Sequence, residues 1–171
     1  MLRSTRTAFL LALAAAACQT RSPRVVHADT ARRQALFEAV AGLEGRWQME
    51  GPEGPAFIEF ALTAGGSAVR ETMFPGTPHE MVNMYTLDGN ALTMTHYCAA
   101  GNQPHMRADA LDGDKLAFRT AGVSDLKSAD EHYMGAMTLV LIDEDHIEQH
   151  WISLNAPESD HMPAFALTRV R

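Results

Sequence analysis

Residues 77–106, T-P-H-E-M-V-N-M-Y-T-L-D-G-N-A-L-T-M-T-H-Y-C-A-A-G-N-Q-P-H-M, contain the clearest β-hairpin in the chain. Two strand-like segments, 80–87 and 91–98, flank the turn D-G-N at 88–90. These turn residues tolerate the positive φ that tight hairpins require. The stretch also holds three of the eight histidines and two of the three tyrosines. We therefore expect both the organising hairpin and the functional site in this stretch.

Short segments separated by turn residues continue along most of the chain. Turns such as A-G-G at 64–66 and D-G-D at 112–114 each lie between two strand-like segments, whereas the polar stretch 121–131 is expected to be a loop. We expect strands at 46–50, 56–63, 67–73, 80–87, 91–98, 105–111, 115–120, 132–142, 146–154 and 163–170. Consecutive hairpins favour a meander, and closing it removes the exposed edges. The predicted fold class is all-β, an antiparallel up-and-down barrel of about 8–10 strands.

A helical period occurs only before these strands. Leu36, Phe37, Val40 and Leu43 recur at intervals that place them on one helix face. The pattern predicts one short N-terminal helix over 30–43.

The first residues are typical of a secretory signal. Arg3 and Arg6 precede the apolar run 8–17, which is shorter than the roughly 20 residues that span a bilayer. Cys18 then follows three alanines and resembles the lipidated cysteine of a bacterial lipobox. The alternative is cleavage at an A-x-A-like site ending at Ala28.

These features predict the domain organisation and the location. We expect a signal peptide at 1–17, a tether at 18–29 and a single barrel domain at 30–171. The protein is expected to be exported, either to a bacterial periplasm or to a membrane through a lipid anchor on Cys18.

Composition limits the partners. The chain carries a net charge of −7 and contains only two lysines, whereas nucleic-acid phosphates require a basic surface, so nucleic acid is not an expected partner. Cys18 and Cys98 are the only cysteines. If Cys18 is lipidated or removed, Cys98 has no partner for an intrachain disulfide.

The two ends of the strand region resemble those of lipocalin-like (calycin) barrels. G-R-W at 45–47 resembles the G-x-W signature that opens the first strand, and F-A-L-T-R at 165–169 resembles the last strand that pairs with it. The resemblance implies that Arg169 packs over Trp47 and closes the barrel base. A guanidinium can stack on an indole while its donors satisfy carbonyl groups at the strand ends.

Segments 70–81 and 95–106 are similar to those of uncharacterised bacterial lipocalin-like proteins, known as domains of unknown function. Ten-stranded relatives include fatty-acid-binding proteins and nitrobindin-like haem proteins. The nitrobindin signature G-x-W-x-G-x-G lacks its inner glycine at 45–51, which argues against haem. The cofactor is therefore left open.

Strand alternation assigns faces to the hairpin. In 91–98, Leu92, Met94, His96 and Cys98 share one face, which is apolar until its end, so we expect it to point into the barrel with His96 and Cys98 near one mouth.

The orientation of two other polar residues stays open. Glu71 alternates with apolar residues, so it is either a buried functional group or a sign that its face is outside. Tyr85 lies on a strand with apolar residues on both faces. On the strand at 146–154, Trp151 is expected to point inward and His150 outward.

We expect the ligand-binding residues to be polar or soft side chains near the mouth. They are Glu71, Tyr85, Met94, His96, Cys98, Asn102, His105 and Trp151.

The histidines also allow a metal site. His96 and Cys98 could bind a soft metal ion if His105, or else His79 or His150, lay near them. The competing interpretation is a hydrogen-bonded core histidine beside a small buried cysteine.

The favoured function is an exported, non-enzymatic barrel that binds a small apolar or amphipathic ligand. The first alternative is a metal- or haem-binding barrel using His96 and Cys98, which includes the case of an enzyme, with His161 as a further haem-ligand candidate. The second is a structural envelope protein whose barrel is filled by its own side chains. No catalytic residue is assigned.

Overall fold

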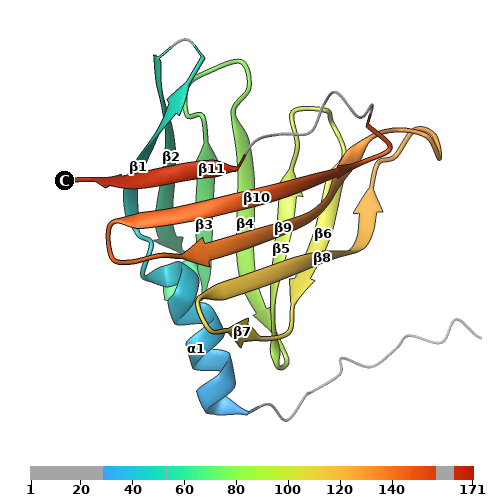
Figure 1. Ribbon diagram of the computed structural model, residues 1–171. Helices are drawn as coiled ribbons and strands as arrows, with labels where there is room; N and C mark the ends of the chain where they lie inside the picture. The colour runs from blue at the N-terminus through green and yellow to red at the C-terminus, as the bar shows by residue number, and fades with distance from the viewer. Residues whose placement is uncertain (1–28, 53, 157–163) are drawn as a thin grey trace, which may run out of the picture.

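The computed structural model describes residues 29–52, 54–156 and 164–171. The expected signal peptide, Cys18, most of the expected tether and His161 lie outside these residues. The described chain forms a closed antiparallel barrel of ten strands with one short helix near its start (Figure 1). The predicted fold class is confirmed.

The barrel is a meander in which the first and last strands, β1 and β11, also pair with each other. The sheet order is β6-β5-β4-β3-β2-β1-β11-β10-β9-β8-β7, and pairing of β6 with β8 completes the ring. The elements are α1 Thr30–Ala41, β1 Gly45–Gly51, β2 Gly54–Thr63, η1 Ala64–Gly66, β3 Ala68–Met73, β4 Met81–Asp88, β5 Ala91–Tyr97, β6 Gln103–Ala108, β7 Leu111–Asp112, β8 Lys115–Ser124, β9 Tyr133–Leu141, β10 His146–Leu154 and β11 Phe165–Val170.

The bounds of β6 and β8 differ from the sequence prediction. The expected strand at 105–111 is two strands, because β6 ends at Ala108 and the two-residue β7 follows. Residues 121–124, expected to be loop, belong to β8. Residues 122–124 pair with 103–105, and a bulge follows between His105 and Met106. Without this pairing, both strands would expose backbone groups at an edge.

Helix α1 covers one end of the barrel (Figure 1). Asp29 caps it by accepting a hydrogen bond from the Arg32 amide, and Leu36 and Val40 are the buried residues of the helix. The Asp29 amide also donates to Asn90 Oδ1 at 2.8 Å, which ties the helix to the β4–β5 turn. We call this end of the barrel the helix end.

The structure brings Trp47 and Arg169 together at the helix end. The two residues are register partners on β1 and β11, and the guanidinium carbon lies 4.3 Å from the indole centre. Arg169 donates to the backbone oxygens of Gly42, Glu44 and Glu144, and Trp47 Nε1 donates to Leu43 O. This is the contact that the resemblance implied.

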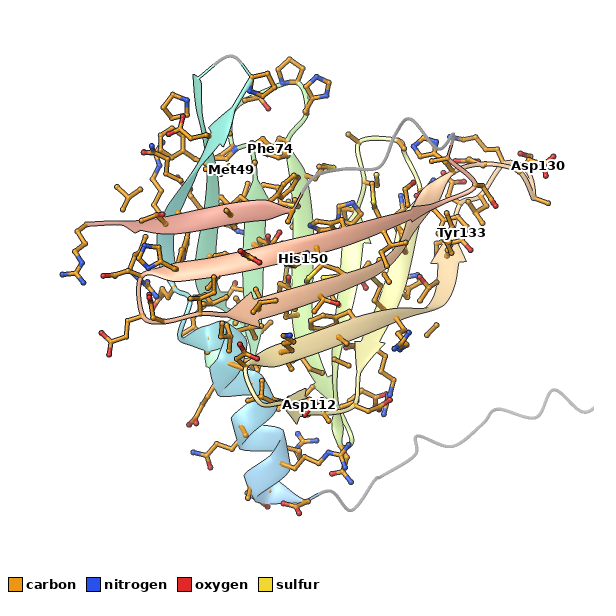
Figure 2. All side chains as sticks on the ribbon, in the orientation of Figure 1. Met49, Phe74, Asp112, Asp130, Tyr133 and His150 are labelled. Atoms are coloured by element: carbon orange, nitrogen blue, oxygen red, sulfur yellow. The ribbon has the colours of Figure 1, made fainter. Side chains whose placement is uncertain are left out.

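The opposite end is formed by the connections 74–80, 98–102 and 125–132, and we call it the loop end. Figure 2 labels Phe74 and Asp130 there and Asp112 at the helix end. Between the two ends, aromatic and methionine side chains are buried among the aliphatic ones, including Tyr85, Phe118 and Met137. Among the residues that the structure describes, no helix is both long and apolar enough to cross a membrane.

Candidate functional site

Three polar side chains form a row inside the barrel. Glu71 on β3 is the register partner of Asn83 on β4, which is the register partner of His96 on β5. Direct partners on neighbouring strands point to the same face. Glu71 and Asn83 are 0% exposed and His96 is 1% exposed. The row is therefore entirely within the core.

Glu71 is the centre of a hydrogen-bond network. Its Oε2 accepts from Tyr85 Oη at 2.6 Å and from Asn83 Nδ2 at 2.8 Å, while its Oε1 accepts from Gln149 Nε2 at 2.7 Å. Gln149 lies on β10, which three strands separate from β3 in the sheet, so this bond crosses the barrel interior. Burial raises the pKa of Glu71, and its three donors oppose that rise. Burial and the neighbouring carboxylate raise the pKa of Tyr85.

The two amides in the network have defined orientations. Gln149 donates to Glu71 through its nitrogen, so its oxygen accepts from Trp151 Nε1 at 3.1 Å. Asn83 likewise donates to Glu71 and leaves its oxygen 2.6 Å from His96 Nδ1. An amide oxygen only accepts, so His96 Nδ1 must carry the hydrogen in this bond.

This arrangement leaves His96 Nε2 as a bare acceptor. The pKa of His96 is lowered from 6.5 to about 4 by burial, so the ring is neutral near pH 7. In a neutral ring with a protonated Nδ1, Nε2 carries a lone pair. Nε2 is buried and has no hydrogen-bond partner among the described residues, and the Trp151 ring centre lies 4.9 Å from the imidazole centre. Such a nitrogen can accept a hydrogen bond or bind a metal.

The structure places most of the expected ligand-binding residues inside the barrel. Glu71 and Tyr85, whose faces were open, both point inward. The buried residues of this set within the barrel are Glu71, Tyr85, Met94, His96 and Trp151. The expected inward face of 91–98 is confirmed by the burial of alternate residues.

The other expected residues lie at the loop end or outside. Cys98 is a half-buried free thiol directly after β5. Asn102 is buried, but its amide donates to Glu131 Oε1 and His132 O and so holds two loops together. His105 is on the outer face, where it bonds to hydroxyl groups of the neighbouring strands.

The expected metal trio does not converge. His105 lies between Pro104 and Met106, both buried, so alternation directs it away from the interior that contains His96. Over residues 29–52, 54–156 and 164–171, no three His, Cys, Asp or Glu side chains are grouped to hold a metal ion. His150 is exposed on the outer face of β10 as expected (Figure 2), where it contacts Glu148.

Sequence reasoning missed Asn83 and Gln149. Gln149 lies between Ile147 and Trp151 on the inward face of β10, so the alternation of side chains along this strand was sufficient to predict that it points inward. Asn83 shares its face with Tyr85. Polar residues on otherwise buried faces were the available signal, and Glu71 was the group for them to satisfy.

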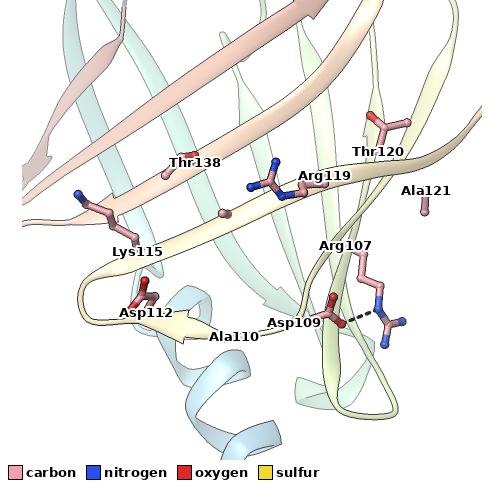
Figure 3. Close-up of a pocket in the computed structure, with 10 residues that line it drawn as sticks. Arg107, Asp109, Ala110, Asp112, Lys115, Arg119, Thr120, Ala121 and Thr138 are labelled. Carbon is pink, nitrogen blue, oxygen red and sulfur yellow. Dashed lines mark hydrogen bonds and ion pairs between the residues drawn. The ribbon is translucent and has the colours of Figure 1, made fainter.

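Two surface hollows lie apart from this network. A cleft of about 770 Å³ at the loop end is lined by Phe57, Phe74 and several prolines. A second hollow, of about 600 Å³, lies on the outer surface near β7 and β8 (Figure 3). Arg119 and Lys115 line it beside Arg107, which is bonded to Asp109. Both hollows are open to solvent, whereas the polar row is enclosed.

The chain matches none of the protein-family models and none of the curated proteins with which it was compared.

Proposed function

We propose that this protein binds a small apolar or amphipathic molecule within the loop-end half of the barrel, beside His96 and Trp151. The observation that carries the proposal is the unpartnered Nε2 of a histidine that is otherwise fixed and buried. A buried acceptor without a partner costs about 1–3 kcal/mol, so a ligand that donates to it regains that free energy. Asn83 fixes the orientation of the imidazole through Nδ1, which leaves Nε2 free to accept a hydrogen bond from a ligand.

The neighbouring side chains suit an apolar ligand body. Met73 and Met81 are register partners at the loop end, and Met94 precedes His96 on the same inward face. Methionine side chains are flexible and polarisable, so they can move aside for a ligand without losing their packing. Trp151 adds a flat aromatic surface beside the imidazole.

The fold supports the same proposal. A closed ten-stranded barrel with an arginine over the first-strand tryptophan is compatible with a lipocalin-like, or calycin, barrel. We propose that kinship, and with it the use of the barrel interior as the binding site. The basic and apolar start of the chain supports a further proposal, that the protein is exported and tethered through Cys18.

The same histidine favours a second candidate function. Metal-ligating histidines donate their other N–H to a fixed acceptor, as His96 does to Asn83. Among the described residues, His96 Nε2 is the one nitrogen of the polar row that is available as a metal ligand. A single protein ligand suits a group such as haem better than a bare metal ion. His96 Nε2 would be the atom that holds the group.

Native mass spectrometry with elemental analysis separates these functions. The protein should be purified from its natural compartment, together with His96→Asn as the site variant and His150→Asn as a matched outer-face control. We expect an organic mass, without metal, on the wild type and on His150→Asn but not on His96→Asn. Stoichiometric metal that His96→Asn loses would select the second candidate. A bare protein that also fails to bind added amphiphiles would contradict both and favour a filled structural barrel.

A further inference from the structure

We infer that the head group of the ligand is an uncharged hydrogen-bond donor, such as a hydroxyl, and not a carboxylate. This inference rests on the proposed function and names the class of molecule that the same site selects.

The His96 ring is held in the tautomer that accepts at Nε2. If the hydrogen were on Nε2, the lone pair of Nδ1 would face the Asn83 oxygen, and two acceptors would oppose each other. Rotating the Asn83 amide to correct this would turn its oxygen toward Glu71 Oε2, where two acceptors would oppose each other. The network around Glu71 therefore keeps Nε2 as an acceptor.

Two further unpartnered polar atoms lie at the loop end. They are Asn102 Oδ1, on the β5–β6 connection, and Ser153 Oγ, two residues after Trp151 on β10. Together with His96 Nε2, they are the buried side-chain polar atoms without partners among the described residues. All three can accept a hydrogen bond, and only the serine hydroxyl can donate one. A hydrogen-bond donor would satisfy each of the three, and His96 Nε2 is the one that belongs to the polar row.

The charge inside the barrel disfavours an anion. The buried polar and charged residues of the described chain are Glu71, Asn83, His96, Asn102 and Gln149, and they include no lysine or arginine. A buried carboxylate would lack a cation and would lie in the same core as the Glu71 carboxyl group. His96 does not supply the charge, because burial lowers its pKa to about 4.

The same groups disfavour an ammonium ion. An ammonium group carries three donors, and both Glu71 oxygens already accept from Tyr85, Asn83 and Gln149. A hydroxyl needs one strong acceptor, which His96 Nε2 provides.

A matched series of alkyl probes tests this inference on the intact protein. Octanol, octyl methyl ether and octanoate share an apolar chain and differ in the head group. Binding is followed by calorimetry and by Trp151 fluorescence, with Trp151→Phe identifying the signal of this tryptophan. We expect octanol to bind roughly tenfold more tightly than the ether, the scale of one buried hydrogen bond, and octanoate to bind most weakly.

The His96→Asn variant isolates Nε2. An asparagine amide nitrogen lies near the position of Nδ1, so it retains a donor for Asn83, and no asparagine atom takes the position of Nε2. We expect this variant to bind octanol and the ether equally, whereas His150→Asn on the outer face keeps the wild-type preference. If His96→Asn does not fold, the ranking of the three probes on the wild type decides.

The outcomes separate the inference from the proposed function. Equal binding of octanol and the ether to the wild type, or tightest binding of octanoate, would overturn the inference and leave a ligand-binding barrel. Binding of none of the probes, with no ligand retained in native mass spectrometry, would overturn both.

Discussion

Replacing His96 with asparagine is expected to remove a large part of the acid sensitivity of the fold. In the native state the pKa of His96 is about 4, against 6.5 for an unperturbed histidine, because burial disfavours the charged ring. Between these two values the unfolded chain binds more protons at this residue than the folded chain. The free energy of unfolding therefore falls as the pH is lowered from about 6.5 to about 4, and the contribution of His96 is fully present above that range.

The magnitude follows from the size of the pKa shift. One pKa unit corresponds to about 1.4 kcal/mol, so the shift from 6.5 to about 4 corresponds to roughly 3 kcal/mol. Glu71 acts in the opposite direction, because its pKa is raised and its protonated form is favoured in the fold. Its contribution is greatest below the unperturbed value of 4.5 and is lost as the pH rises. Comparison of the wild type with His96→Asn, which keeps Glu71, isolates the histidine.

The assay is urea unfolding at a series of pH values, followed by tryptophan fluorescence and circular dichroism. We expect the stability difference between the wild type and His96→Asn to change by roughly 3 kcal/mol between pH 7 and pH 4, with the wild type losing more. His150→Asn should follow the wild type, because that side chain is exposed. If the difference in the free energy of unfolding between the wild type and His96→Asn were the same at both pH values, the assignment of His96 as a buried neutral imidazole would be refuted.

Three further changes test the rest of the structure by urea unfolding near pH 7. Arg169→Ala should lower the free energy of unfolding by about 3 kcal/mol, since it removes donors to three backbone carbonyls and the contact with Trp47. Arg171→Ala is the control, because Arg171 is exposed, and it should change the free energy of unfolding by less than about 0.5 kcal/mol. Equal effects of the two substitutions would refute the role of Arg169 in closing the barrel. Glu71→Ala leaves three buried donors without an acceptor and should lower the free energy of unfolding by roughly 3 kcal/mol or more. Glu71→Gln keeps one oxygen as an acceptor and should lower it less. The reverse order would contradict the hydrogen-bond network around Glu71. Asp29→Ala removes the cap of α1 and should cost about 1 kcal/mol, and an unchanged stability would show that the cap does not stabilise the helix.

Local rules were sufficient for most of the barrel wall. The D-G-N turn at 88–90 and the alternation in 91–98 defined a hairpin and the face of it that points inward, because side chains of a strand alternate between two faces. The D-G-D turn at 112–114 likewise predicted that 105–111 and 115–120 lie side by side, and β6 and β8 do pair there, as Met106 with Thr120 and Arg107 with Arg119. The extension of β8 over 121–124 was not predicted, because the segment A-G-V-S has no local strand pattern and lies beyond a bulge in the β6–β8 pairing.

The interior network was harder to derive for a similar reason. The orientations of Glu71 and Tyr85 stayed open because the pattern of a single strand does not show its neighbours. Whether a carboxylate on an apolar face points into the core depends on the hydrogen-bond donors that other strands supply. Those donors come from β4 and from β10, across the barrel. His96 was correctly placed inside, but its tautomer depends on Asn83, whose orientation depends in turn on Glu71.

Nitrogen NMR of the imidazole rings near pH 7 is the most direct test of the buried acceptor. The His96 signals can be assigned by their loss in His96→Asn. We expect a neutral ring with the hydrogen on Nδ1 and an unprotonated Nε2 whose resonance shifts when octanol is added. A hydrogen on Nε2, or an unprotonated Nε2 that does not respond to a bound ligand, would contradict a site organised around this nitrogen.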